Sequence, residues 1–207
     1  KIIGLIIPEI VHYFFSTILL GVTKTAEMYN YSVIVVQSDD DYKSEIKQLA
    51  FLLDKNVDGI LLSLADNTIH FNHVKDIINQ GVPLVLYDRA SKLIDCNKVV
   101  IDDVRAAQMA TQHLIDIGCK KIAIIRNQLK SQGTIDRHKG YKKALLENGM
   151  KYDKSLDFEG QDFSFSEGKI AGNRICERHR DIDGIFAVTD LMAIGALEAL
   201  KEHNIAV

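Results

Sequence analysis

Pro83-Leu-Val-Leu-Tyr-Asp-Arg-Ala90 is the stretch of sequence that decides the fold. Leu84, Val85 and Leu86 form a short apolar run, which predicts a strand that is buried on both faces. Asp88 and Arg89 follow this run directly, although charged side chains are costly inside a core. They suit the carboxyl end of a parallel strand, where open α/β sheets bind ligands. The stretch therefore predicts one wall of a small-molecule cleft, with a plain ion pair at a strand end as the alternative.

The rest of the chain alternates short apolar runs with helical patterns, which is typical of parallel sheets with crossover helices. The predicted strands cover residues 2–7, 33–37, 59–63, 83–87, 98–101, 121–125 and 184–188. Helices are expected between them, the first over residues 14–30. The second helix carries Ile46, Leu49, Ala50 and Leu53 at the spacing of one apolar helix face.

Polar residues and glycines predict where the helices begin and end. The expected N-caps are the 38–41 segment, Thr68, Asp102 or Asp103, Thr134 or Asp136, and Thr189 with Asp190. Ser164 and Glu167 have the spacing of a capping box. Gly81, Gly118 and Gly149 follow three of the helices and suit the left-handed conformation that ends a helix.

An internal echo suggests that the chain contains two similar halves. Val57-Asp-Gly-Ile60 and Ile182-Asp-Gly-Ile185 each follow a helix and open a strand. Asp-Gly is also common turn chemistry, so the echo alone is weak. We expect an α/β fold of two Rossmann-like lobes, residues 1–101 and 102–207, in which helices flank parallel sheets. A strand-like hinge near residues 100–103 would join them.

Composition limits the possible function classes. The 207 residues carry a net charge of −3, so no basic field predicts nucleic-acid binding by this chain itself. Cys96, Cys119 and Cys176 are odd in number and far apart, which favours free thiols in a reducing, cytoplasmic compartment. No apolar run is long enough to span a membrane, and no signal peptide is visible.

Neither a metal nor a cofactor is predicted. His70 and His73 lie three residues apart on one expected helix, but no cysteine or further histidine is near them in the sequence. Both ends of the chain look cut. Residue 1 is not Met, and residues 205–207 look like the opening of another strand. We therefore expect a fragment of a longer protein.

The segments that follow the predicted strands combine aromatic rings with hydrogen-bonding groups. Sugars and nucleosides need both, because their apolar faces stack on rings while their hydroxyl groups bind polar partners. Asp accepts hydrogen bonds from hydroxyl groups, and Arg donates them from a rigid fork. The sequence therefore predicts a ligand of the sugar or nucleoside type.

Several motifs occur in an order that resembles one known family. They are Ile2-Ile-Gly-Leu-Ile-Ile-Pro8, Phe14-Phe15, Val57-Asp-Gly-Ile60, Asp88-Arg89, His113-Leu-Ile-Asp-Ile-Gly118 with Lys121-Ile-Ala123, Arg137-His-Lys-Gly-Tyr141, and Thr189-Asp-Leu-Met-Ala-Ile-Gly-Ala196. Together they resemble the effector-binding region of the LacI/GalR family of transcription factors, whose fold is that of the type I periplasmic binding proteins. The resemblance covers nearly the whole chain.

The resemblance implies a set of ligand-binding residues. They are His12, Phe14, Phe15, Asp88, Arg89, Arg137, Phe163, Thr189 and Asp190. Each has a structural alternative: Phe14 and Phe15 as core residues, Arg137 as a surface charge, Thr189 and Asp190 as helix caps only. His12-Tyr13 stands where the family commonly has Asn-Pro, and Thr189 where it has Asn, which leaves the ligand class open.

The implied function is ligand sensing and dimerisation in a transcriptional regulator. A small-molecule effector would bridge the lobes and shift a hinge equilibrium. Operator DNA would bind through a helix-turn-helix that is not in this chain, and residues 17–26 and 191–200 would form a homodimer contact. A stand-alone solute-binding protein of a sugar transporter is the alternative. An enzyme is not expected, because G-x-G-x-x-G, P-loop and G-x-S-x-G motifs are all missing.

Overall fold

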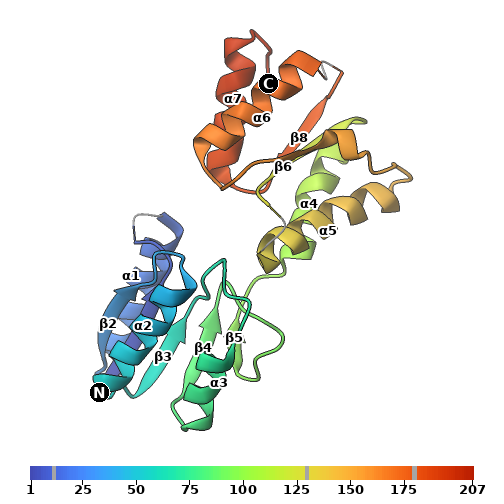
Figure 1. Ribbon diagram of the computed structural model, residues 1–207. Helices are drawn as coiled ribbons and strands as arrows, with labels where there is room; N and C mark the ends of the chain where they lie inside the picture. Colours follow the sequence, from blue (N-terminus) through green and yellow to red (C-terminus); the bar gives the residue numbers. More distant parts are fainter. Residues whose placement is uncertain (11–12, 129–130, 179–180) are drawn as a thin grey trace. The chain divides into compact units, whose positions relative to one another are not determined.

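The computed structural model describes residues 1–10, 13–128, 131–178 and 181–207. The chain divides into two compact units, Lys1–Ile101 (unit 1) and Asp102–Val207 (unit 2). In Figure 1, unit 1 runs from blue to green and unit 2 from green to red. Each unit contains one parallel sheet flanked by helices, as the alternating sequence pattern predicts.

Unit 1 contains a five-stranded sheet in which every pair is parallel. The strand order is β2 (Ser32–Gln37), β1 (Ile2–Ile7), β3 (Gly59–Leu62), β4 (Leu84–Tyr87) and β5 (Asn97–Val99). From β1 the chain steps to one side for β2 and then to the other side for β3. This reversal is the topological switch point of the sheet, outside whose carboxyl edge such folds bind ligands.

The helices of unit 1 cover both faces of this sheet. They are α1 (Tyr13–Met28), α2 (Tyr42–Asp54) and α3 (Asn72–Asn79). Because crossovers are right-handed, the reversal at β1 places α1 on one face and α2 with α3 on the other (Figure 1). Successive residues of β1 feed two cores: Leu5 and Ile7 pack with Phe15 of α1, whereas Ile6 packs with Leu49 of α2.

Unit 2 repeats the centre of this topology with fewer strands. Its sheet has the order β7 (Asp157–Glu159), β6 (Ile122–Arg126) and β8 (Gly184–Ala187). Its helices are α4 (Asp103–Asp116), α5 (Gln132–Glu147), α6 (Phe165–Arg178) and α7 (Asp190–Glu202), with a short 3₁₀ helix at Lys154–Leu156. Helix α4 packs on α5 and α6 packs on α7, one pair on each face of the sheet (Figure 1).

Glycines let the paired helices of unit 2 approach closely. A Cβ atom built on Gly140 of α5 would lie 2.2 Å from the carbonyl oxygen of Val104, and one on Gly195 of α7 would lie 2.1 Å from that of Phe165. Neither separation is possible for a real side chain, so these positions require glycine for packing rather than for backbone freedom.

Several helix starts differ from the sequence-based expectation. The Thr68 cap is wrong: α3 begins at Asn72 without a side-chain cap, and the Thr68 hydroxyl group donates instead to Glu45. The start of α5 at Thr134 or Asp136 is also wrong. Ser131 caps this helix, and the Thr134 hydroxyl group donates to Asn127 over 2.6 Å. In both places the hydroxyl group bonds to another segment of the chain, to Glu45 of α2 in the first case and to Asn127 in the second.

Half of the expected capping box is present in α6. The Ser164 hydroxyl group accepts a hydrogen bond from the Glu167 amide, but the Glu167 carboxylate accepts from the amide of Gln161 rather than from that of Ser164. Strand β7 is absent from the predictions because its three residues are mostly polar. Residues 205–207, which were expected to open a strand, have no regular secondary structure.

The buried face of α2 is rotated from the predicted one. Glu45, Leu49 and Leu52 are buried, whereas Ile46 and Ala50 are exposed. The rotation follows from Glu45, whose carboxylate finds hydrogen-bond donors inside the protein. Predictions at the other helix ends are confirmed: Asp41 and Asp102 cap α2 and α4, and Gly81, Gly118 and Gly149 have positive φ.

None of the three cysteines forms a disulfide bond, and Cys176 is buried. In the described part of the chain, no helix is both long and apolar enough to cross a membrane.

Candidate functional site

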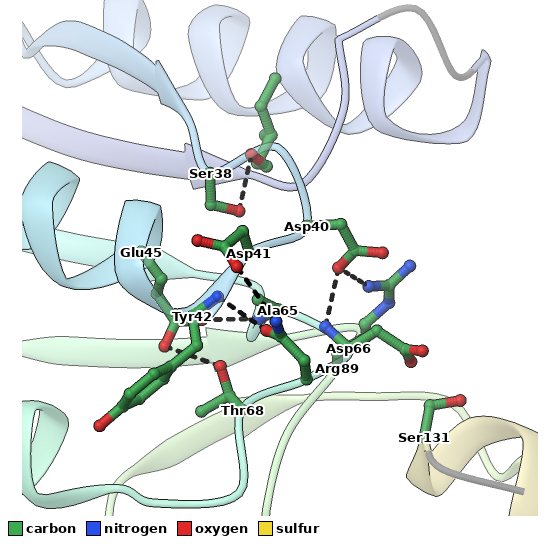
Figure 2. Close-up of polar contacts among 12 residues, drawn as sticks. Ser38, Asp40, Asp41, Tyr42, Glu45, Ala65, Asp66, Thr68, Arg89 and Ser131 are labelled. Carbon is green, nitrogen blue, oxygen red and sulfur yellow. Dashed lines mark hydrogen bonds and ion pairs between the residues drawn. The ribbon is translucent and has the colours of Figure 1, made fainter.

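In unit 1, the loops that follow β2, β3 and β4 are tied together by one carboxylate. Oδ1 of Asp40 accepts hydrogen bonds from the Arg89 guanidinium group and, over 2.7 Å, from the backbone amide of Asp66 (Figure 2). The carbonyl oxygen of Arg89 in turn accepts from the amide of Leu64 over 3.1 Å. Arg89 therefore stands at the carboxyl edge of the sheet in a fixed position, next to an acidic partner.

A second pair of carboxylates holds the same loops from α2. Asp41 accepts from the amides of Lys43 and Ser44 and from the side chain of Asn67, and these hydrogen bonds lower the pKa of its carboxyl group. Glu45 is fully buried and accepts from the amide of Ala65 over 2.6 Å (Figure 2). The loop after β3 is therefore fixed at both of its ends.

Backbone conformation separates the strand ends from the helix ends. The described non-glycine residues with positive φ are three asparagines and three aspartates. Asn30, Asn56 and Asn204 follow α1, α2 and α7, where a left-handed residue ends a helix. The aspartates instead follow β2 and β4: Asp39 (φ 53°), Asp40 (φ 54°) and Asp88 (φ 55°). Sparsely populated backbone conformations gather at functional sites, which favours the carboxyl edge as such a site.

Unit 2 presents Arg137 at its own switch point, between β6 and β8. Nε of Arg137 donates to Asp103 Oδ1 over 2.8 Å, and Nη1 donates to the carbonyl oxygen of Val188 over 2.9 Å. Nη2 has no partner among the described residues. Two nitrogens of Arg137 therefore bond within unit 2, and its role in ligand binding stays a prediction.

Each switch point also contains a buried hydroxyl group without a hydrogen-bond partner among the described residues. Ser63 follows β3, and its Oγ is completely buried. Thr189 is the N-cap residue of α7, yet its Oγ1 makes no cap hydrogen bond and is also buried. The interpretation of Thr189 as a capping side chain is therefore wrong. Unsatisfied buried hydroxyl groups are costly, and at a ligand site the missing partner can come from the ligand.

The predicted aromatic residues differ in exposure. Phe15 is buried in the core of unit 1 with Leu5, Ile7 and Tyr87, as its structural alternative proposed. Phe14 contacts Phe15 edge to face at 5.2 Å between ring centroids and stays 44% exposed. Phe163 packs on the core of unit 2 and is partly buried. Phe14 and Phe163 therefore retain ring surface for a ligand.

Unit 2 contains a buried charge network that was not predicted from the sequence. Arg126, the last residue of β6, is 7% exposed and forms ion pairs with Asp157 (Nε to Oδ1, 2.8 Å) and Glu159 (Nη1 to Oε2, 2.6 Å). His138 Nε2 lies 3.1 Å from Asp157 Oδ2, and the Tyr152 hydroxyl group donates to the same oxygen over 2.7 Å.

This network sets the pKa of Asp157. Burial alone would raise it, but hydrogen bonds from His138, Tyr152 and Arg126 together lower the pKa to about 2. Burial and the bond to Asp157 raise the pKa of Tyr152 to about 12. Asp157 is therefore ionised and fully engaged at neutral pH.

Two of the predicted ligand-binding residues, Asp190 and His12, remain. Asp190 is exposed in the first turn of α7, where a carboxylate suits the helix dipole. His12 lies outside the described residues.

Asp40, Asp66 and Asp103 were not predicted as site residues, because their role depends on contacts between loops. Their position directly after a strand or at a helix start was the signal that could have identified them.

No group of three potential metal ligands occurs among residues 1–10, 13–128, 131–178 and 181–207. His73, one of the two histidines considered, has its Nε2 atom 2.7 Å from Glu45 Oε1. The carboxyl edge of the sheet in each unit instead carries a guanidinium group beside a carboxylate, together with neutral hydroxyl groups. Such pairs bind vicinal hydroxyl groups, since one member donates and the other accepts.

Comparison with known proteins places the whole chain in one family. All residues from 1 to 207 match the family described as periplasmic binding proteins and the sugar-binding domain of the LacI family. Catabolite control protein A of Priestia megaterium is 32% identical over 206 residues, which cover 99% of this chain and 61% of that protein. The chain thus spans about three fifths of the length of the curated relatives it matches.

Solved structures agree with this assignment. The crystal structure of the transcription regulator CcpA of Lactococcus lactis has a TM-score of 0.87 and 34% identity, and the match covers 100% of this chain and 74% of that one. A LacI-family transcriptional regulator from Enterococcus faecium with bound ribose has a TM-score of 0.85 and 25% identity, with the same coverage of both chains.

Proposed function

We propose that this chain is the effector-binding part of a transcriptional regulator. The chain belongs to the family of periplasmic binding proteins and LacI-type sugar-binding domains, and the proposal starts from this membership. The observation that carries the proposal is the match over all 207 residues, together with relatives that are themselves regulators. The effector would be a small molecule of the sugar or nucleoside class. A bound ribose in the Enterococcus faecium relative supports this class.

We propose Asp88 and Arg89 as effector-binding residues of unit 1, and Arg137 and Thr189 as those of unit 2. The Arg89–Asp40 and Arg137–Asp103 pairs would each bind hydroxyl groups, and Phe14 and Phe163 would cover apolar faces of the ligand. Arg89 and Arg137 are already held by their aspartates, so little side-chain entropy would be lost on binding.

Regulation would follow from differential affinity. An effector that favours one arrangement of the two units shifts the equilibrium toward it, and operator binding is then coupled to effector binding by the same free energy. Operator DNA would bind through a helix-turn-helix outside this chain.

A homodimer would form through α1 and α7. Leu191, Ile194 and Leu197 of α7 are roughly half exposed, whereas Met192 and Leu200 of the same helix are buried in unit 2. The helix therefore has apolar side chains on two faces, and the outer one suits a partner.

The alternative, a solute-binding protein of a transporter, shares the family and the fold. It is less supported, because the relatives compared above are regulators and not enzymes or transport proteins. The absence of catalysis and a cytoplasmic location are parts of the same proposal.

Thermal-shift screening of purified protein with sugars and nucleosides tests the proposal, since a ligand that binds the native state raises the melting temperature. We expect Asp88→Asn and Arg137→Ala to abolish the shift. Asparagine is chosen at position 88 because it tolerates the left-handed backbone. Arg105→Ala, at an exposed arginine of α4, is the matched control and should keep the full shift. Full ligand affinity in both site variants would overturn the assignment of these residues.

A further inference from the structure

Glu45 is a buried carboxylate on an otherwise apolar helix face. It is completely buried on α2, one turn before the buried Leu49. In the described part of the chain no lysine or arginine pairs with it, and its ionisable neighbour is His73 of α3, whose Nε2 lies 2.7 Å from Glu45 Oε1. A buried carboxylate is costly unless hydrogen bonds replace its water, and an apolar side chain would fill this position without that cost. Core packing alone therefore does not explain a glutamate here.

The donors that satisfy Glu45 come from one loop and from the helix that follows this loop. The loop runs from residue 63, after β3, to residue 71, before α3. Oε2 of Glu45 accepts from the Ala65 amide over 2.6 Å, and Oε1 accepts from the Thr68 hydroxyl group over 3.2 Å (Figure 2). His73, in the first turn of α3, contacts the same Oε1 atom. One carboxylate thus holds both the loop and the start of α3.

The residues beside Ala65 in this loop fix the strand-end arginine of the same unit. The amide of Asp66 donates to Asp40 Oδ1 over 2.7 Å, and the same oxygen accepts from the Arg89 guanidinium group. The amide of Leu64 donates to the Arg89 carbonyl oxygen over 3.1 Å. Ala65 therefore stands between one residue that shares an acceptor with the Arg89 side chain and another that binds the Arg89 backbone.

Glu45 cannot contact an effector itself. Its side chain is completely buried, and both of its carboxylate oxygens already accept hydrogen bonds. Any influence of Glu45 on binding must therefore pass through the loop to Arg89. A binding group that is held in place before the ligand arrives loses less entropy on binding, whereas loops without such support open easily. A rigid loop thus offsets the cost of burying this carboxylate.

We propose, resting on the proposed function, that Glu45 is a positioning residue, which holds residues 63–68 so that Arg89 is fixed for effector binding. The proposal concerns unit 1 alone and does not depend on the chemical class of the effector. It adds to the proposed function a residue on the buried face of α2 that a ligand does not touch.

Hydrogen exchange of the full chain without ligand, measured by mass spectrometry, tests the effect on the loop. Glu45→Met keeps an unbranched side chain and removes both acceptors, so exchange of residues 63–68 should become about tenfold faster. Glu45→Gln retains an oxygen for the Ala65 amide and should restore most of the protection. Leu49→Val, on the same buried face, is the matched control and should leave the loop at its original exchange rate. Unchanged exchange in Glu45→Met would overturn the proposal.

Isothermal titration calorimetry with ribose, glucose and adenosine tests the effect on binding. For a probe that binds the original protein, we expect Glu45→Met to weaken binding about tenfold, and Glu45→Gln and Leu49→Val to weaken it less than about threefold. Unchanged affinity in Glu45→Met, or equal weakening by Leu49→Val, overturns the inference and leaves the proposed function standing. If the original protein binds none of the probes, the result counts against the proposed function and overturns the inference with it.

Thr68→Val provides the same test if Glu45→Met does not fold. It removes one loop donor and leaves the Glu45 carboxylate with Ala65 and His73. We expect exchange of residues 63–68 to rise about threefold and probe affinity to fall by a similar factor. Exchange and affinity that both keep their original values would contradict the positioning role.

Discussion

Asp58 in unit 1 and Asp183 in unit 2 occupy the same corner of two different sheets. Each precedes the glycine that opens a strand, and each exchanges hydrogen bonds with the start of the central strand. Asp58 accepts from the Ile2 amide over 2.6 Å and donates its own amide to the Ile2 carbonyl oxygen. Asp183 accepts from the amides of Lys120 and Lys121 and donates to the Lys121 carbonyl oxygen. The repeated Asp-Gly therefore sets the register in both units.

The carboxyl ends of the same central strands differ completely. Strand β1 ends in Leu5, Ile6 and Ile7, all completely buried. Strand β6 ends in Arg126, which is buried in an ion network with β7 and α5. Unit 1 places its buried charge on a helix instead, at Glu45. The same topology thus accepts a buried charge at different places, provided that fixed partners surround the charge. Variants in the two units can show how far the units are equivalent.

The largest effect is expected from Arg126→Met in unit 2. The substitution leaves Asp157 buried without its cation, and breaking a buried ion pair costs about 3–5 kcal/mol. Hydrogen exchange, measured by mass spectrometry at increasing urea concentrations, should show that only unit 2 loses stability. Glu45→Gln is the counterpart in unit 1 and should cost less, because the amide oxygen still accepts from Ala65. Equal losses would mean that the two buried charges are equivalent.

A second contrast concerns glycines in helices. Gly195→Ala in α7 places a methyl group against the Phe165 carbonyl oxygen and should destabilise unit 2 by about 1–3 kcal/mol. A methyl group on Gly21 of α1 would have no other atom within 4 Å, so Gly21→Ala should stabilise unit 1 by up to about 1 kcal/mol. Urea denaturation of both variants gives the sign of each change. A stabilising Gly195→Ala would contradict the close α6–α7 packing.

Acid should weaken unit 2 through Asp157. The pKa of this carboxyl group is about 2 in the folded protein and near 3.8 when unfolded, so the folded state binds fewer protons. The resulting stability, about 2 kcal/mol, is complete above about pH 4 and is lost as the pH falls toward 2. Denaturant midpoints between pH 5 and pH 2 should show this loss in unit 2, and Asp157→Asn should flatten it. If the stability of the Asp157→Asn variant fell with pH as steeply as that of the original protein, Asp157 would not be the cause of the acid sensitivity.

The smallest effect compares the two corner aspartates. Asp183→Ala removes two backbone hydrogen bonds and Asp58→Ala removes one, so we expect losses of about 1–2 kcal/mol and about 1 kcal/mol, respectively. Chemical denaturation of the two single variants measures the difference. Asp181→Ala, at an exposed neighbour on the same loop whose carboxylate pairs with Lys121, is the control for loss of a surface ion pair. A larger loss for Asp58→Ala would show that the two corners are not equivalent.

The sheet and its order of elements could be predicted because apolar periodicity and Asp-Gly turn chemistry act locally. Strand β1 was predicted with its observed bounds, and the Asp41 and Asp102 caps were found from the sequence. Strand β7 was missed because its buried residues include charged ones, which carry no apolar signal. The helix starts at Thr68 and Thr134 were wrong because each hydroxyl group bonds outside its expected helix, Thr68 to Glu45 of α2 and Thr134 to Asn127.

For the candidate site, the sequence predicted ligand-binding residues near the strand ends, including Asp88, Arg89, Arg137 and Thr189, and their contact with a ligand stays a prediction. Their partners remained hidden, because Asp40 and Asp103 lie 49 and 34 positions from the arginines they hold. The order of hydrophobic and polar residues by itself determined two parallel α/β units and the edge where polar groups gather. Only the tertiary structure decided which charges are neutralised and which hydroxyl groups are left unsatisfied, since pairing depends on distances across loops that local sequence does not encode.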